Sequence, residues 1–206
     1  MTGVFVTFDG PGAAGKSTLI RAVADALTRR GIAPVTTCSP TRTPLGDQLR
    51  AGTHTYRGMA MACLIAGDRH HQLVTEIEPA ITAGRIVLCD RFLPSSLVLQ
   101  GGIDGIDSDV IWHLHRGIWT PDLAILLRAE VPVLEHRLAL RGAHSRYEQQ
   151  PGSSRTESEL FATVAADLRR KGWPIAEVDT TRRSCENIAA MLVDHILHLH
   201  TRRTSA

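Results

Sequence analysis

Gly10-Pro-Gly-Ala-Ala-Gly-Lys-Ser17 is the stretch that decides the fold of this 206-residue chain. It matches the pattern G-x-x-x-x-G-K-[ST], in which backbone N–H groups of a glycine-rich loop turn inward around phosphate oxygens. Lys16 is expected at the β- and γ-phosphates of ATP, and the Ser17 hydroxyl is expected to ligate Mg²⁺. The residues predicted to bind ATP are Gly10, Pro11, Gly12, Ala13, Ala14, Gly15, Lys16, Ser17 and Thr18.

The segments on either side of this loop are those that the motif requires. Residues 4–8 form a short β-branched and aromatic run, which indicates a buried strand. Residues 16–30 carry apolar side chains at helical spacing, and Gly31 ends that pattern. A helix that begins at Lys16 directs the positive end of its dipole at the bound phosphates.

The remainder of the chain alternates between strand and helix patterns. Strands are predicted at 34–37, 85–89, 122–127 and 175–178, of which the strand at 85–89 is almost wholly apolar, and helices at 58–83 and 186–199. Such alternation predicts a parallel sheet with right-handed crossovers. We expect an α/β protein with a three-layer P-loop kinase fold, in which a five-stranded parallel sheet carries helices on both faces, and a single domain over 1–206.

Two charged residues follow the strand at 85–89. Ligands of open α/β sheets collect beyond the carboxyl ends of the strands, so Asp90 and Arg91 are placed beside the phosphate loop. Asp90 is predicted to hold Mg²⁺ together with Ser17, and Arg91 to offset charge on the transferring phosphoryl group. The structural alternative is a surface salt bridge at a strand end.

The composition of the chain indicates which classes of partner and which cellular compartment to expect. The net charge of +2 indicates no surface for nucleic acid, and no apolar run approaches a membrane span. The four cysteines are scattered, which suits free thiols in a reducing compartment. We therefore expect a cytoplasmic protein that binds small nucleotides, with no nucleic-acid or membrane partner.

Further motifs resemble those of the thymidylate kinase family, from Phe5 to about Ile188. Thr43-Pro-Leu-Gly46 is similar to the family's T-P-L-G, and Gly67-Asp-Arg69 to its A-D-R. The run from Asp90 to Gly101 follows the pattern D-R-Y-x-x-S-S-x-A-Y-Q-G. Arginines and a glutamate between 137 and 148 resemble the family's lid. The run at 90–101 and the lid together carry the specificity of this resemblance.

The resemblance implies a role for each matching residue. The expected acceptor-binding residues are Asp9, Arg42, Ile65, Arg69, Arg91, Ser96, Leu99 and Gln100. Among them Arg69 would read the edge of the acceptor base, and Arg42 and Arg91 would bind the acceptor phosphate. Arg141 and Arg146 would close over ATP from a mobile lid at 142–157, and together with Lys16 and Arg91 they are the implied catalytic residues. The family also implies a homodimer, and the apolar face of the helix at 58–83 is either part of the core or the helical dimer interface that the family uses.

Several positions depart from the family's pattern. Gly12 stands in place of a carboxylate in the phosphate loop, and Ala13 replaces the next glycine or arginine. Ile65 stands where a phenylalanine stacks on thymine, and Leu99 stands where a tyrosine precedes the glutamine. Loss of an aromatic platform removes on the order of 1 kcal/mol of binding. We therefore expect an ATP-dependent kinase of dTMP or of a modified pyrimidine nucleotide.

Two other functions remain open at this point. One is a P-loop kinase of a non-nucleotide acceptor, and the other is a nucleotide-binding regulatory protein without turnover. Three tryptophans are interpreted as packing residues rather than base-stacking platforms, namely Trp112, Trp119 and Trp173. Arg155, Glu157 and Glu159 are interpreted as the solvated start of the helix after the lid.

Overall fold

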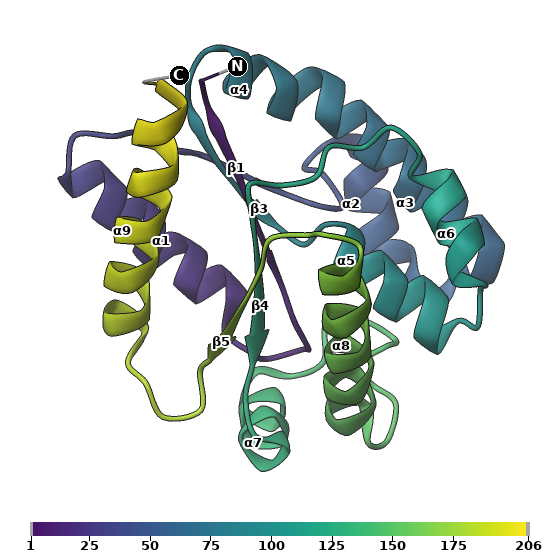
Figure 1. Ribbon diagram of the computed structural model, residues 1–206. Coiled ribbons are helices and arrows are strands. Elements are labelled where there is room, and N and C mark those ends of the chain that lie inside the picture. The colour runs from purple at the N-terminus through teal and green to yellow at the C-terminus, as the bar shows by residue number, and fades with distance from the viewer. Residues whose placement is uncertain (1, 205–206) are drawn as a thin grey trace.

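A five-stranded parallel sheet forms the centre of the computed structural model, which describes residues 2–204 (Figure 1). The strands lie in the order β2-β3-β1-β4-β5, and every neighbouring pair is parallel. They are β1 (Val4–Asp9), β2 (Val35–Cys38), β3 (Ile86–Asp90), β4 (Leu123–Arg128) and β5 (Ile175–Asp179). All five strands predicted from the sequence are present, and every strand begins and ends within one residue of its predicted limits. The α/β P-loop kinase fold is confirmed.

The central strand is apolar on both of its faces because helices cover both sides of the sheet. All six residues of β1 are buried. Val4, Val6 and Phe8 pack on one side against α1 (Lys16–Arg29) and α9 (Cys185–Thr204), while Phe5 packs in the cluster on the other side. In Figure 1 these two helices, purple and yellow, lie on one side of the sheet. Burial on both faces explains why β1, β3 and β4 are largely apolar, whereas the outer strands β2 and β5 are only partly buried.

The opposite face carries most of the other helices (Figure 1). They include α3 (Gly58–Gln72), η2 (Leu73–Ile77), α4 (Glu78–Thr82), α5 (Leu93–Ser96), η3 (Leu97–Ile103), α6 (Ser108–Leu114) and α8 (Ser153–Arg170). The helix predicted over 58–83 is thus divided, because a π-helical turn at η2 separates α3 from α4. The remaining elements are α2 (Pro44–Ala51), η1 (Gly52–His54) and α7 (Val131–Arg141).

The tryptophans pack in this second layer. Trp173 is buried in the cluster that contains Phe5 and Phe92, and Trp112 and Trp119 pack against the same cluster. The rings of Trp112 and Trp173 meet edge to face, with centroids 6.1 Å apart. This arrangement confirms the interpretation of the tryptophans as packing residues.

The strand order brings the predicted site together at one edge of the sheet. Phe8 of β1 pairs with Asp90 of β3, so the loops that follow these two strands start side by side. The strands β3 and β2 lie on one side of β1, and β4 and β5 lie on the other. The strand order thus reverses at β1, and in α/β sheets a ligand-binding crevice lies at such a point, here beside the phosphate loop. Within residues 2–204, no helix is both long and apolar enough to cross a membrane.

Candidate active site

The loop at 10–15 has the backbone conformation that an anion-binding loop requires. Gly10 has a φ of +143°, Ala13 of +60° and Gly15 of +91°. A side chain at Gly10 would also place Cβ 2.5 Å from the carbonyl oxygen of Leu127. Glycine is needed at Gly10 both for its backbone angle and for the close approach of β4.

Lys16 is buried at the end of this loop and is held by the loop itself. Its Nζ donates to the carbonyl oxygens of Gly10 at 2.8 Å and Pro11 at 2.7 Å. Burial, reinforced by the nearby guanidinium of Arg91, lowers the pKa of Lys16 to about 7. The amino group of Lys16 thus points into the loop, where a bound anion would raise its pKa and keep it fully protonated.

Ser17 and Asp90 meet where the phosphates would end. Ser17 Oγ donates to Asp90 Oδ2 at 2.8 Å. Asp90 Oδ1 is buried and has no hydrogen-bond partner within residues 2–204. A hydroxyl beside a carboxylate with one unsatisfied oxygen is a suitable donor set for Mg²⁺, which prefers oxygen ligands and retains several waters. The residues present therefore fit the predicted metal.

Asp9 supports the turn after β3 and lies behind the cavity. Its Oδ1 accepts hydrogen bonds from the N–H of Phe92 at 2.9 Å, the N–H of Ser95 at 3.0 Å and Ser95 Oγ at 2.6 Å. Burial raises the pKa of Asp9 in spite of these bonds. The turn holds Arg91 at a φ of +70° and directs it into the cavity. Asp9 thus supports an acceptor residue, and it is not itself among the residues that line the cavity.

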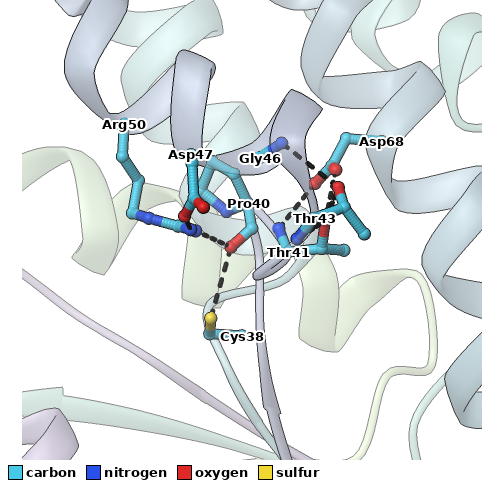
Figure 2. Close-up of polar contacts among 8 residues, drawn as sticks. All are labelled: Cys38, Pro40, Thr41, Thr43, Gly46, Asp47, Arg50 and Asp68. Carbon is cyan, nitrogen blue, oxygen red and sulfur yellow. Dashed lines mark hydrogen bonds and ion pairs between the residues drawn. The ribbon is translucent and has the colours of Figure 1, made fainter.

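The loop after β2 is fixed by a buried carboxylate, as Figure 2 shows. Asp68 of α3 accepts from the N–H of Thr41 at 2.8 Å and from Thr41 Oγ1 at 2.6 Å. The helix α2 packs so closely that a Cβ on Gly46 would lie 1.9 Å from the Thr41 carbonyl oxygen. Arg50 donates to the carbonyl oxygen of Pro40 and pairs with Asp47. These contacts hold the loop after β2 and the helix α2 in place, so that Arg42 and Arg50 line the cavity.

One cavity of about 950 Å³ joins these parts. Its lining includes predicted phosphate-loop residues, an arginine cluster and an apolar wall. The loop residues that line it are Ala13, Ala14, Gly15, Lys16, Ser17 and Thr18. The arginine cluster is Arg42, Arg50 and Arg91, and the apolar wall is Leu49, Met61, Ile65 and Leu99. Among the expected acceptor residues, Arg42, Ile65, Arg91, Leu99 and Gln100 all line this cavity.

Arg69 is buried outside the cavity lining, and both terminal nitrogens of its guanidinium form hydrogen bonds. Its NH1 donates to Ser96 Oγ at 2.9 Å and lies 2.6 Å from His115 Nε2. Its NH2 donates to Ser39 Oγ at 3.2 Å and to the Phe92 carbonyl oxygen at 3.0 Å. Burial lowers the pKa of Arg69 to about 10, which leaves it charged. Both Arg69 and Ser96 are buried and outside the cavity lining, so their expected contacts with the acceptor remain predictions.

His115 is a neutral acceptor for this buried cation. A guanidinium only donates, so Nε2 accepts from Arg69 and the ring proton lies on Nδ1, which is 2.8 Å from the Ile111 carbonyl oxygen. Burial, followed by the charge of Arg69, lowers the pKa of His115 to about 3. His115 was not identified from the sequence, because nothing in its own segment indicates that α6 reaches α3.

The segment between α7 and α8 covers the cavity. Arg141 ends α7 and pairs with Glu148 at 2.7 Å, and the His144 N–H donates to the same carboxylate oxygen at 2.8 Å. Burial opposes the charge of Glu148, but these donors hold its pKa below the usual value. Arg141, His144 and Glu148 all line the cavity. The helix α8 begins at Ser153, so the irregular part of the predicted lid covers residues 142–152.

Arg146 occupies a different position from Arg141. Its NH2 lies 2.6 Å from Asp104 in a buried ion pair, and its guanidinium stacks over the Tyr147 ring. Tyr147 lines the cavity and accepts from Gln100 Nε2 at 3.2 Å, whereas Arg146 is outside the lining. The structure therefore brings Arg141 but not Arg146 to the cavity, and the catalytic role of Arg146 stays a prediction.

The interpretation of Glu157 as a solvated residue is wrong. Its side chain is buried, and Oε2 accepts from the Gly12 N–H at 2.8 Å. The cavity lining also includes Arg50, Arg137 and Arg183, to which the sequence analysis assigned no catalytic or binding role. Arg137 belongs to the motif that resembles the lid, whereas nothing in the sequence around Arg50, near the end of α2, indicates that its side chain reaches the cavity.

A phosphate loop that faces an arginine cluster across one cavity defines a P-loop kinase of a phosphorylated acceptor. The thymidylate kinase family profile matches residues 8–180. A probable thymidylate kinase of Caldivirga maquilingensis is 30% identical over 195 residues, which cover 93% of each chain. A thymidylate kinase of Thermomicrobium roseum is 34% identical over 182 residues, which cover 84% of this chain and 86% of the relative. The chain belongs to the thymidylate kinase family and is a nucleoside monophosphate kinase that uses ATP.

Proposed function

We propose that this chain transfers the γ-phosphate of ATP to the 5′-phosphate of dTMP or of a closely similar pyrimidine nucleotide. The observation that carries the proposal is the single cavity that joins the phosphate loop to Arg42, Arg50 and Arg91. Lys16 of the phosphate loop and these arginines line the same cavity, which suits two phosphate groups that must approach each other. The names of the relatives support thymidylate as the acceptor.

The apolar wall supports a pyrimidine with a substituent at C5. Leu49, Met61 and Ile65 pack together, and Ile65 and Leu99 both line the cavity. Aliphatic side chains provide dispersion contacts for a ring and a methyl group but do not stack as an aromatic ring does. Bulkier C5 substituents are therefore the natural second class of acceptor for this wall.

In the proposed reaction, an acceptor phosphate oxygen attacks the γ-phosphorus in line, and the bond to the β,γ-bridging oxygen breaks to release ADP. The attacking oxygen is already anionic, so no strong general base is required. Lys16, Arg91 and Arg141 lie where they would neutralise the charge of the phosphoryl group. Glu148 holds Arg141 in place from the covering segment. Exclusion of water by this segment would favour transfer over hydrolysis.

We further propose Mg²⁺ as the resident metal, held by Ser17 and Asp90. When bound, the ion would neutralise phosphate oxygens of ATP and fix their geometry. The unsatisfied Asp90 Oδ1 supports this assignment. Within the described chain no cluster of three or more histidine, cysteine or acidic residues forms a separate metal site.

The proposal also includes a homodimer and a cytoplasmic location. On α3 and η2 the buried residues Met61, Ile65 and Leu73 face the interior, while Met59 and Val74 remain exposed. These exposed side chains suit self-association through that helical face. All four cysteines are free thiols, which suits a reducing compartment. Light scattering during gel filtration, with Val74→Glu as the disrupting variant, tests the dimer.

A panel of acceptors tests the function. The purified protein is given ATP and Mg²⁺ with dTMP, dUMP, dCMP, the purine monophosphates and C5-substituted dUMP derivatives, and ADP release is followed. We expect dTMP or a C5-substituted analogue to give the highest kcat/KM. If no nucleotide raises ADP release above ATP alone, the acceptor is not a nucleotide, or the chain binds ATP without turnover. A second panel of small alcohols and phosphonates separates these two results, because only a kinase of a non-nucleotide acceptor would release ADP with one of them.

A further inference from the structure

Gly12 lies between two carboxylates that come from distant parts of the chain. Its N–H donates to Glu157 Oε2 of α8 at 2.8 Å, and this bond is buried. Glu148 approaches from the covering segment, so that a Cβ on Gly12 would lie 2.7 Å from Glu148 Oε1. The first part of the phosphate loop is therefore in direct contact with both the cover and the helix that follows it.

Glu157 differs from Glu148 in its partners. Glu148 is paired with Arg141, whereas no ion pair within 4.0 Å is found for Glu157 in the described chain. Burying a carboxylate without a cation is costly unless it accepts strong hydrogen bonds. The bond to Gly12 N–H is the hydrogen bond that compensates this burial, and it joins segments 145 residues apart.

The charge of Glu157 also acts on the interior of the loop. Among the influences on Lys16, Asp90 and Glu157 are the carboxylates that favour its charged form most, whereas burial and Arg91 oppose that form. A leucine or alanine at position 157 would remove both this field and the acceptor for the Gly12 N–H. Glu157 thus contributes to the phosphate loop without lying among the residues that line the cavity.

We propose that Glu157 is a positioning residue that ties α8, and with it the covering segment 142–152, to the phosphate loop. The hydrogen bond between Glu157 and Gly12 fixes the position of the covering segment relative to the phosphate loop, so that Glu148 and Arg141 are directed into the cavity when substrates bind. A Cβ on Gly12 would meet the end of the Glu148 side chain and displace its carboxylate. This role rests on the proposed phosphoryl transfer, since its purpose is to align the cover with ATP.

The test compares Glu157→Leu and Glu157→Gln with Glu159→Leu, which alters an exposed glutamate on the same helix. For Glu157→Leu we expect kcat to fall about ten- to a hundredfold, the range set by one hydrogen bond to a charged group. The Kd for ATP should change much less, and ATP hydrolysis without acceptor should rise relative to transfer. Glu157→Gln keeps an acceptor oxygen and should recover part of kcat, while Glu159→Leu should match the wild type.

Amide hydrogen exchange provides a readout that does not depend on turnover. In Glu157→Leu, and to a smaller extent in Glu157→Gln, exchange should accelerate in both 10–17 and 142–152 without substrates. If Glu157→Leu does not fold, kcat and amide hydrogen exchange of Glu157→Gln test the proposed role instead. Gly12→Ala should likewise lower kcat and accelerate exchange in 142–152.

Two results would overturn the tie. One is unchanged exchange in both segments together with wild-type kcat in the folded Glu157 variants. The other is tighter ATP binding with unchanged or higher kcat, which would mean that the carboxylate competes with phosphate. A wild-type protein without any acceptor-dependent ADP release would instead contradict the proposed function, and the exchange data would still decide whether Glu157 ties the two segments.

Discussion

Ser17 Oγ lies 2.8 Å from Asp90 Oδ2, so the start of α1 and the end of β3 present two oxygen ligands side by side. The pairing follows from the register of the sheet, in which Phe8 lies opposite Asp90 and the phosphate loop leaves β1 at that point. A hydroxyl and a carboxylate from different elements are thereby held together by the parallel sheet, before any metal or nucleotide binds.

Asp90→Asn should lower kcat by about a hundredfold and raise the Mg²⁺ concentration needed for half-maximal rate. The amide keeps the size of the side chain but loses the charge that binds the ion, and removal of one charge-stabilising group costs a factor of this order. Titration of kcat against free Mg²⁺ measures the effect. An unchanged Mg²⁺ dependence in this variant would contradict the metal assignment.

ATP binding should take up a proton near neutral pH. The pKa of Lys16 is lowered to about 7 in the free protein, and an anion in the loop will raise it. Calorimetry of ATP binding at pH 8, in buffers with different ionisation enthalpies, should show proton uptake by the wild type and none by Lys16→Met. Lys16→Met should also lower kcat by several orders of magnitude while remaining folded.

Stability should rise with pH above neutrality. The folded pKa of Lys16, about 7, is below the ordinary value of 10.5. Between these values the unfolded chain holds a proton that the folded chain lacks, so the destabilisation is fully present below about pH 7 and declines as the pH rises toward 10.5. Chemical denaturation at several pH values should show this slope in the wild type, and a smaller slope in Lys16→Met.

His115→Phe should weaken acceptor binding without affecting ATP. Phenylalanine cannot accept from the buried Arg69, so one donor loses its partner at a cost of about 1–3 kcal/mol in folding stability. The resulting shift of Arg69 should in turn raise the acceptor KM. Because the pKa of His115 is about 3, the wild-type acceptor KM should show no titration of this residue between pH 5 and 8. His113→Phe, an exposed change on the same helix, is the control. Equal effects from both variants would contradict the role of His115.

Substitutions of Arg141 and Arg146 should differ in their effects on the free energy of unfolding. Arg146 forms a buried ion pair with Asp104, so Arg146→Gln should destabilise the protein by about 3–5 kcal/mol. Arg141 is more exposed, with 37% of its side chain accessible, so Arg141→Gln should lower kcat with little change in melting temperature. Thermal unfolding and steady-state kinetics on both variants test this contrast. A large loss of stability in Arg141→Gln alone would reverse the assignment.

The fold could be predicted because its signals are local. The phosphate-loop pattern, the apolar strands and the glycines that end helices each depend on neighbours within a few residues, and all five strands appear where expected. Lys16, Ser17, Asp90 and Arg91 were likewise found from their positions after strands. The π-helical turn that divides the helix over 58–83 has no such signal, since α3 and η2 are both apolar on one face.

The rest of the site depends on contacts between distant segments. Glu157 resembles any acidic residue near a helix start, and only the packing of α8 against the loop shows that it bonds Gly12. Arg69 matches a motif, but its four bonds to three separate segments determine that it lies behind the cavity. The resemblance to the family implied the same role for Arg146 as for Arg141, and the pairing of Arg146 with Asp104 follows from the position of η3.

The last helix has a practical consequence for handling the protein. α9 starts beside the cavity, where Cys185 and Ile188 are part of the lining, and Arg203 at its far end pairs with Asp122, just before β4. Figure 1 shows both ends of the described chain at this amino-end edge of the sheet. A tag or surface linkage attached at either end therefore leaves the substrate entrance pointing away from the support, so immobilised protein is suited to ligand screening.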